Sequence, residues 1–209
     1  MLHYKTVEPT TLGLLKSLME IPECQQFRLV GGTALSLLLG HRNSIDLDLF
    51  TSNEFDNELL VNVLKTKFPD LILSPQKSKR LLFVRINDIK VDFVHTFEPF
   101  ISEHQVIDNI RFANLEEIAA MKLNAITGRG AKKDFWDIHR LLKDFSMEQL
   151  ISFYQKRYPG NDLMMVIKSF NYFEDAELHT DPVNFENINW TTIKNELIKT
   201  LKDYLNTKN

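Results

Sequence analysis

The segment over residues 29 to 50, LVGGTALSLLLGHRNSIDLDLF, constrains the fold more than any other part of this chain. An apolar run over residues 27 to 30 ends at Gly31 and Gly32, and Thr33 opens a stretch that is apolar enough for a buried helix. This order predicts a strand, a tight glycine turn and a helix N-terminus. Backbone N–H groups are unpaired at such a turn and the helix dipole is positive there, so Gly31, Gly32 and Thr33 are candidates to hold a phosphate.

The next segment predicts a strand with two carboxylates on one face. Apolar and acidic residues alternate over residues 45 to 50, so Asp46 and Asp48 share one face and the apolar side chains share the other. Asp92 lies in a second alternating segment, over residues 89 to 94. If the three carboxylates converge, they supply the hard oxygen ligands that Mg²⁺ prefers. The alternative is three hydrated aspartates on the face of a sheet.

The glycine turn, the short helix and the Asp-x-Asp strand resemble the first motif of the DNA polymerase β-type nucleotidyltransferase fold. The chain is more similar still to the AbiEii/AbiGii-type nucleotidyltransferase toxin family, because this segment is followed by MKLNAITGR at residues 121 to 129 and KKDFWDI at residues 132 to 138. The resemblance covers residues 27 to 142. Many families of this fold carry Gly-Ser at the turn, whereas Gly31 and Gly32 match the Gly-Gly of the toxin branch.

The resemblance implies an enzyme that uses an NTP and two Mg²⁺ ions. In this fold the glycine turn holds the triphosphate and three carboxylates hold the metal, which makes Asp46, Asp48 and Asp92 the implied metal ligands. The implied reaction moves an NMP group from the NTP to an acceptor and releases pyrophosphate. The implied setting is a bacterial toxin–antitoxin system, with tRNA or another RNA as acceptor and a cognate antitoxin as partner.

Basic and acidic residues of the second half add to this site. Lys122 and Arg129 are seven residues apart, about two helical turns, so they share a face. Asp134 and Asp137 are spaced i, i+3 at the start of the next helix, where carboxylates suit the dipole. We expect Lys122 and Arg129 to face the triphosphate and the two aspartates to hold them. The resemblance implies that Lys133, Asp134 and Asp137, a Lys-Asp-x-x-Asp element, are needed for activity; the alternative is a helix pair with surface salt bridges.

Other residues are weaker candidates. Arg42, with His41, precedes the Asp-x-Asp strand and is a candidate contact for the nucleotide. Phe135 and Trp136 are interpreted as packing between the two halves, with base stacking as the alternative. A basic hairpin is interpreted as a solvated edge strand, with contact to an acceptor nucleic acid as the alternative. Its basic residues are Lys77, Lys79, Arg80 and Arg85.

The remaining patterns predict an α+β fold. A helix near residues 10 to 19, another over 55 to 68, and strands over 71 to 73 and 81 to 86 indicate a small mixed sheet with helices packed on it. From residue 110 the pattern is helical, with capping boxes expected at Asn114 with Glu117 and at Ser146 with Gln149. We therefore expect a nucleotidyltransferase catalytic domain over residues 1–108 and a C-terminal helical bundle over residues 109–209 that completes the active-site cleft.

Composition limits the partners and the compartment. The net charge of −3 and the pI of about 6.1 argue against a general electrostatic nucleic-acid binder, so an RNA contact requires a local basic patch. One cysteine, Cys24, excludes an intrachain disulfide and fits a reducing cytoplasm. No leader pattern begins the chain, and no apolar run approaches the ~18 residues that a membrane span requires. We expect a cytoplasmic protein that does not contact a membrane.

Two alternatives to the RNA-directed toxin stay open. The same chemistry on a small molecule such as an aminoglycoside, or on a protein hydroxyl in AMPylation, fits the acidic chain better than a bulky nucleic acid does. A non-catalytic nucleotide-binding module is the second alternative. The presence of Asp46, Asp48 and Asp92 argues against that module.

Overall fold

The computed structural model describes residues 1–75 and 78–208. Within this part, seven strands form one mixed sheet in the order β3-β4-β5-β2-β1-β7-β6. The strands are β1 (Arg28–Val30), β2 (Leu47–Thr51), β3 (Ile72–Leu73), β4 (Leu81–Ile86), β5 (Ile89–His95), β6 (Gln105–Ile107) and β7 (Ile110–Phe112). The parallel pairs β1·β7 and β2·β5 lie among antiparallel ones, as the expected mixed sheet requires.

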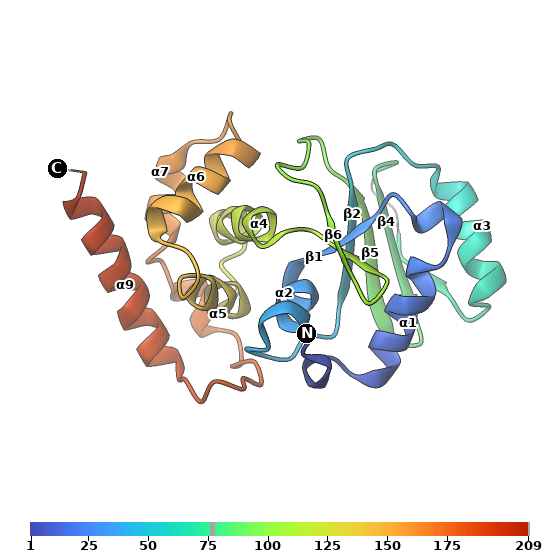
Figure 1. The fold of residues 1–209 in the computed structure, drawn as a ribbon, viewed down its shortest axis with the longest axis horizontal. Coiled ribbons are helices and arrows are strands. Elements are labelled where there is room, and N and C mark those ends of the chain that lie inside the picture. Colours follow the sequence, from blue (N-terminus) through green and yellow to red (C-terminus); the bar gives the residue numbers. More distant parts are fainter. Residues whose placement is uncertain (76–77, 209) are drawn as a thin grey trace.

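Helices cover the sheet and make up the C-terminal half (Figure 1). They are α1 (Pro9–Met19), α2 (Gly31–Leu39), α3 (Asn57–Lys67), α4 (Leu115–Gly128), α5 (Lys132–Leu141), α6 (Met147–Arg157), α7 (Leu163–Ser169), α8 (Glu174–Glu177) and α9 (Trp190–Asn206), with 3₁₀ turns η1 (Tyr4–Thr6) and η2 (Pro22–Cys24). Figure 1 shows α1 and α3 on one side of the sheet and α2 with the helical half on the other. Helix α2 contacts β1, β2, α4 and α5, so it joins the two halves. These observations confirm the expected fold class.

The glycine turn has the expected place but different bounds. Helix α2 begins at Gly31, two residues before Thr33, and Gly31 itself has a φ of +71°. Gly40, with the same φ, ends the helix in the left-handed conformation that glycine adopts most easily. Strand β2 then begins at Leu47, so Asp46 belongs to the preceding loop and the expected strand over residues 45 to 50 is displaced.

Strands β2 and β5 are parallel neighbours, and Asp48 stands opposite Asp92 in their register. The two aspartates therefore point from the same face of the sheet. The residues flanking them in sequence are buried on the other face: Leu47, Leu49, Val91 and Phe93. The turn that brings β5 back beside β4 has positive φ at Asn87 and Asp88 (50° and 62°), which confirms the predicted hairpin.

One expected helix cap is present and the other is wrong. Ser146 and Gln149 form a capping box at the start of α6. The Asn114 side chain instead donates to the Glu103 carbonyl at 2.6 Å, and Glu117 is fully buried, where it pairs with Arg157. The long-range ion pair with Arg157 removes Glu117 from the local cap.

A β-hairpin, β6–β7, interrupts the segment that was expected to be helical from residue 110. Its turn has positive φ at Asp108 and Asn109, and β7 runs parallel to β1 with Leu29 opposite Phe112. The expected domain boundary between residues 108 and 109 thus falls inside this hairpin, and residues 110 to 112 belong to the sheet. The division into two domains stays a prediction.

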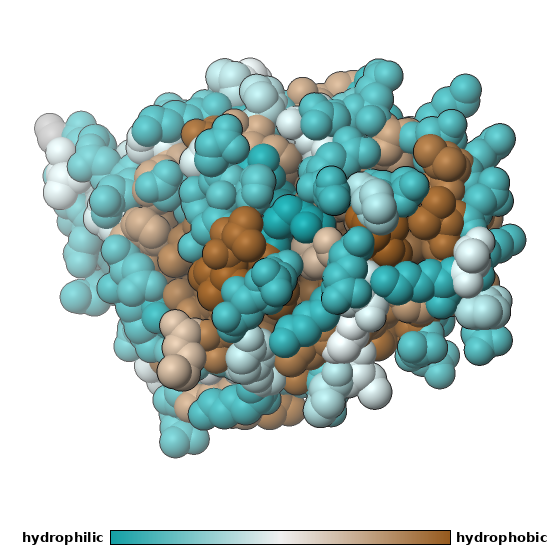
Figure 2. Space-filling view, turned by 45° about the vertical axis from the view of Figure 1, so that its right-hand side comes forward, coloured by the Kyte–Doolittle hydropathy of each residue, from teal (hydrophilic) through white to brown (hydrophobic). Residues whose placement is uncertain are grey.

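The surface is mixed in character. Figure 2 shows one face on which hydrophilic side chains predominate and apolar side chains form separate patches. In the described part of the chain, no helix has both the length and the apolar character needed to cross a membrane.

Candidate active site

The three expected carboxylates lie at the junction of the sheet and the helical half. Asp48 is largely enclosed, and burial together with the charge of Asp92 raises its pKa. Lys90 Nζ lies 2.5 Å from Asp92 Oδ2, and Lys133 Nζ lies 3.7 Å from Asp46 Oδ2. We call Asp46, Asp48 and Asp92 the carboxylate face. The two lysines partly offset the repulsion between its like charges.

The donor chemistry of the carboxylate face fits a divalent cation. Among described residues, no group of three or more His, Cys, Asp or Glu side chains is already arranged as a metal cage. Asp92 Oδ1 is nevertheless buried without a hydrogen-bond partner in the described part of the structure. A Cβ at Gly31 would clash with Asp48 Oδ2, so the carboxylate reaches the glycine turn only because Gly31 has no side chain. Mg²⁺ typically takes one or two protein carboxylates and completes its shell with water and phosphate, which suits this open arrangement.

The glycine turn is tightly enclosed by side chains. A Cβ at Gly32 would lie 2.6 Å from Arg42 Nη2, so this glycine too permits a close approach. Thr33 is fully buried, and its hydroxyl donates to the Asp46 carbonyl and lies 2.9 Å from Ser44 Oγ. The Thr33 hydroxyl therefore has a structural role, because it joins the start of α2 to the loop before β2, and a phosphate contact at Thr33 stays a prediction.

Replacing Gly31 by alanine is expected to destabilise the protein by about 1–3 kcal/mol, because alanine strains at φ +71° and its methyl group displaces the Asp48 carboxylate. The free energy of unfolding from urea denaturation measures this. Gly13→Ala is the matched control, since a Cβ at this helical position meets no atom within 4 Å and should stabilise α1 by up to ~1 kcal/mol. Equal stabilities of the two variants would contradict the close approach of Asp48.

The two aspartates of the Lys-Asp-x-x-Asp element form a buried ion network with cations from α4, from its C-cap residue and from the loop after α2. Lys122 Nζ lies 2.8 Å from Asp134 Oδ1 and 2.6 Å from Asp137 Oδ2, and both aspartates are fully buried. Arg129 makes two hydrogen bonds to Asp134, and Arg42 makes two to Asp137. The surface salt-bridge alternative is thus excluded for Asp134 and Asp137. We call these five residues the buried ion network.

The network revises the expected role of Arg42. Its side chain is 3% exposed, and besides its bonds to Asp137 it donates to the Asn43 carbonyl. His41 Nε2 also lies 2.7 Å from Asp137, so both residues tie the loop after α2 to α5. Arg42 also lines a pocket beside Asp46, and its contact with a nucleotide stays a prediction. Burial alone would raise the pKa of Asp137, but the charges of Arg42 and Lys122 outweigh it and hold that pKa well below its ordinary value.

The lowered pKa values of Asp134 and Asp137 predict loss of stability in acid. A carboxyl group whose pKa is depressed by folding contributes stability that is present above its unfolded pKa, about 4, and lost as the pH falls through the folded pKa. The difference in free energy of unfolding between the wild type and Asp137→Asn should therefore be full at pH 7 and shrink below about pH 4. Denaturant titrations over this range measure it. A difference that stays constant with pH would show that Asp137 is not a charged member of the network.

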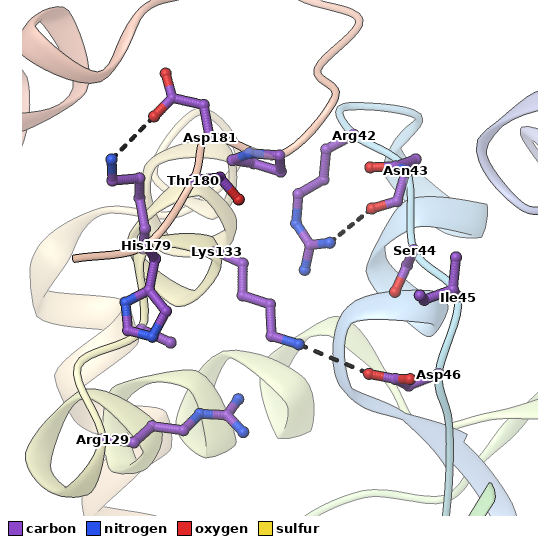
Figure 3. A pocket seen from close by; sticks show the side chains of 13 residues that line it. Arg42, Asn43, Ser44, Ile45, Asp46, Arg129, Lys133, His179, Thr180 and Asp181 are labelled. Carbon is purple, nitrogen blue, oxygen red and sulfur yellow. Dashed lines mark hydrogen bonds and ion pairs between the residues drawn. The ribbon is translucent and has the colours of Figure 1, made fainter. Parts of the chain in front are cut away.

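Two pockets adjoin the carboxylate face. One, of about 520 Å³, lies between residues 42 to 46, the start of α5 and residues 179 to 182. Figure 3 shows Lys133 reaching across it to Asp46, with Arg129 beside them. The other, of about 410 Å³, is lined by Gly31, Asp48 and the facing side of α4. Arg129 lines both pockets, so the two are adjacent and the cation stands between them.

The sequence patterns missed part of this site. Lys90 was not a candidate, although its position two residues before Asp92 on an alternating strand puts both on one face. Asp181 pairs with Lys132 at 3.0 Å and helps to close the larger pocket, but no motif marks residues 179 to 182.

Arg80, Phe135 and Trp136 do not line either of these two pockets. Arg80 packs its guanidinium 3.3 Å from the centre of the Phe97 ring, and Lys77 lies outside the described residues. Trp136 is buried and stacks on Trp190 at 5.6 Å, while Phe135 contacts the Phe173 and Trp190 rings. These ring partners all belong to the helical half. Because Phe135 and Trp136 are themselves buried, neither ring is accessible for stacking on a base.

Comparisons with known proteins identify the family and the fold of this chain. The model of the family described as nucleotidyl transferase AbiEii toxin, type IV TA system, matches residues 13–206. An uncharacterized protein of Aquifex aeolicus (strain VF5) is 31% identical over an alignment of 199 positions, which covers 91% of this chain and 94% of that relative.

Solved structures share the fold. JHP933 from Helicobacter pylori has a TM-score of 0.56 and 22% identity, with 94% of this chain and 92% of that chain covered. MenT4, a nucleotidyltransferase toxin from Mycobacterium tuberculosis H37Rv, has a TM-score of 0.53 and 15% identity, with 90% and 82% covered. At these identities the two likenesses establish the fold alone. Because the family model spans nearly the whole chain, the protein belongs to the AbiEii nucleotidyltransferase toxin family and is a nucleotidyltransferase.

Proposed function

We propose that this nucleotidyltransferase uses Mg²⁺ to transfer an NMP group from an NTP to a hydroxyl of RNA, with tRNA as the leading acceptor. The observation that carries the proposal is the register of β2 and β5, in which Asp48 lies beside Asp92 and reaches the Gly31 turn. A carboxylate pair against a glycine-lined helix start suits a metal-bound triphosphate.

The reaction is an in-line displacement at the α-phosphorus. The acceptor hydroxyl oxygen forms the new bond to phosphorus, the bond to the bridging oxygen of the β-phosphate breaks, and pyrophosphate leaves with that electron pair. Asp92, whose Oδ1 has no hydrogen-bond partner in the described part of the chain, accepts the hydroxyl proton and passes it to water. Bound divalent cations would supply charge neutralisation at the α-phosphate and at the departing pyrophosphate.

The basic residues at the two pockets have two proposed roles: some contact the phosphates of the substrate, and one holds the pocket in place. Arg129 and Lys133 are about half exposed and line the larger pocket, so their charged ends can meet phosphate oxygens. Lys122 is almost fully buried and bonded to Asp134 and Asp137, so it holds the floor of the smaller pocket and adds positive potential there. Positioning and charge neutralisation supply most of the rate in this class of reaction.

An RNA acceptor is supported by family membership and by local charge. The chain as a whole carries a net charge of −3, but Arg129 and Lys133 stand at one wall of the larger pocket, each about half exposed and paired with one aspartate. Such a local basic wall meets the requirement for a phosphate contact on an acidic protein. As a member of a toxin family, the protein is proposed to act in the bacterial cytoplasm and to be controlled by a cognate antitoxin.

Transfer of label from α-³²P NTPs tests the proposal. The protein is incubated with each NTP, Mg²⁺ and bulk RNA, and the products are separated by size and by nuclease or protease sensitivity. Nuclease-sensitive label on RNA is the expected result. Label on protein or on a small molecule would show that the acceptor is not RNA, although the transfer reaction would stand. Retained NTP binding without any transfer would contradict the proposal.

A further inference from the structure

Lys90 occupies the place of a counter-ion on the carboxylate face. It lies two residues before Asp92 on β5, so both side chains leave the same face of the sheet. Its Nζ lies 2.5 Å from Asp92 Oδ2, and its charge also acts on Asp48 and Asp46. The Lys90 ammonium thus contacts one of the three proposed metal ligands and acts on the other two through its charge.

The contact made by Lys90 is exposed and incomplete. The side chain is 50% exposed, and it approaches Asp92 from the open side with its ammonium 6.0 Å from the Phe83 ring centre. It engages only Oδ2, while Oδ1 of Asp92 is buried without a hydrogen-bond partner among the described residues. Ion pairs with this much exposure contribute about 1 kcal/mol or less, so an incoming ion can break this one at little cost.

Lys122 behaves differently, although it also carries a positive charge close to the site. Its Nζ is buried between Asp134 and Asp137, and separating it would leave buried charges unpaired. Of these two lysines, Lys90 is therefore the one that can leave its carboxylate when a stronger cation arrives.

We propose that Lys90 is the resident counter-charge of the carboxylate face and that a divalent cation binds by displacing its ammonium group, so that Lys90 sets the metal affinity of the site. The inference rests on the proposed function, because it assumes that Asp46, Asp48 and Asp92 hold the metal. The lysine keeps the like charges neutralised in the metal-free protein. It also competes with the ion, which lowers the apparent affinity.

Calorimetric titration with Mn²⁺ alone, without nucleotide, tests the competition. Lys90→Met is expected to bind Mn²⁺ about fivefold more tightly than the wild type, because binding no longer requires displacing a positive charge. Lys90→Arg keeps the charge and should bind no more tightly than the wild type. Lys199→Met is the matched control for net charge, since Lys199 is 80% exposed on α9 and should leave the affinity unchanged.

Thermal unfolding gives a second readout that is independent of activity. In EDTA, Lys90→Met should melt below the wild type because its carboxylates lack their counter-charge. Addition of Mn²⁺ should then raise its Tm by more than it raises that of the wild type. An affinity in Lys90→Met equal to or weaker than that of the wild type would overturn the inference.

Asp48→Asn separates failure of this inference from failure of the proposed function. If Asp48→Asn loses Mn²⁺ binding while Lys90→Met binds as the wild type does, the metal site stands and the role of Lys90 is wrong. If Asp48→Asn binds Mn²⁺ as well as the wild type does, or if none of the proteins binds it, the proposed metal site and the inference fall together.

Discussion

Replacing Asp48 by asparagine is expected to reduce kcat/KM for nucleotidyl transfer by at least about a thousandfold, which corresponds to a loss of about 4 kcal/mol of transition-state stabilisation. The asparagine keeps the shape of the side chain but removes the charge that would hold the metal beside Asp92. The labelled-NTP assay measures the loss of transfer, and calorimetry measures the loss of Mn²⁺ binding.

The same variant should remain folded. Burial and the charge of Asp92 raise the pKa of Asp48, so the ionised group is costly in the metal-free protein and removing its charge should leave Tm in EDTA unchanged or higher. Asp203→Asn, on the exposed side of α9, controls for the charge change and should keep full activity. An active Asp48→Asn protein would remove the carboxylate face from the mechanism.

Replacing Asp137 by alanine is expected to have the largest effect on stability, a loss of about 3–5 kcal/mol in the free energy of unfolding. Asp137 is fully buried and bonded to Arg42, Lys122 and His41, so its removal leaves the buried Arg42 without its carboxylate partner and Lys122 with Asp134 alone. Urea denaturation followed by circular dichroism measures the change.

Asp144→Ala is the matched control for Asp137→Ala. Asp144 pairs with Arg140 at i, i+4 and is 39% exposed, so the loss should be about 0.5 kcal/mol. A change of less than about 1 kcal/mol for Asp137→Ala would show that the buried ion network does not hold the two halves together.

The central part of the site could be predicted because its signals are local. Alternation over β5 and around β2, with the Gly31 turn between β1 and α2, places Asp48 and Asp92 by short-range geometry. The spacing of Lys122 with Arg129 and that of Asp134 with Asp137 likewise follow helix periodicity, each within one helix and its cap.

The features that the sequence did not predict depend on contacts between residues that are distant in the sequence. Strand β7 is three residues long and is stabilised by pairing with β1, about eighty positions earlier in the chain. Glu117 has the sequence pattern of a capping residue, but Arg157 from α6 pairs with it in the core. Asp181 reaches the larger pocket through a connection without regular structure. In each case a tertiary contact outweighs the local pattern.

The roles of Thr33 and Arg42 show the same limit at the level of single side chains. Both residues stand beside the glycine turn, so their position in the sequence correctly predicts proximity to it. The Thr33 hydroxyl bonds to Asp46 and Ser44, and the Arg42 guanidinium bonds to Asp137. The sequence alone does not reveal these partners. Position in the sequence therefore predicts that both residues lie near the site. Which groups their side chains bind became visible only in the structure.

Anomalous scattering from Mn²⁺, in crystals grown with a non-hydrolysable NTP, tests the central claim most directly. We expect an Mn²⁺ ion coordinated by Asp48 and Asp92. The triphosphate should lie against the Gly31 turn, and the Lys90 ammonium should have moved away from Asp92. An Mn²⁺ peak elsewhere, or a triphosphate bound away from the glycine turn while Lys90 still pairs with Asp92, would contradict it.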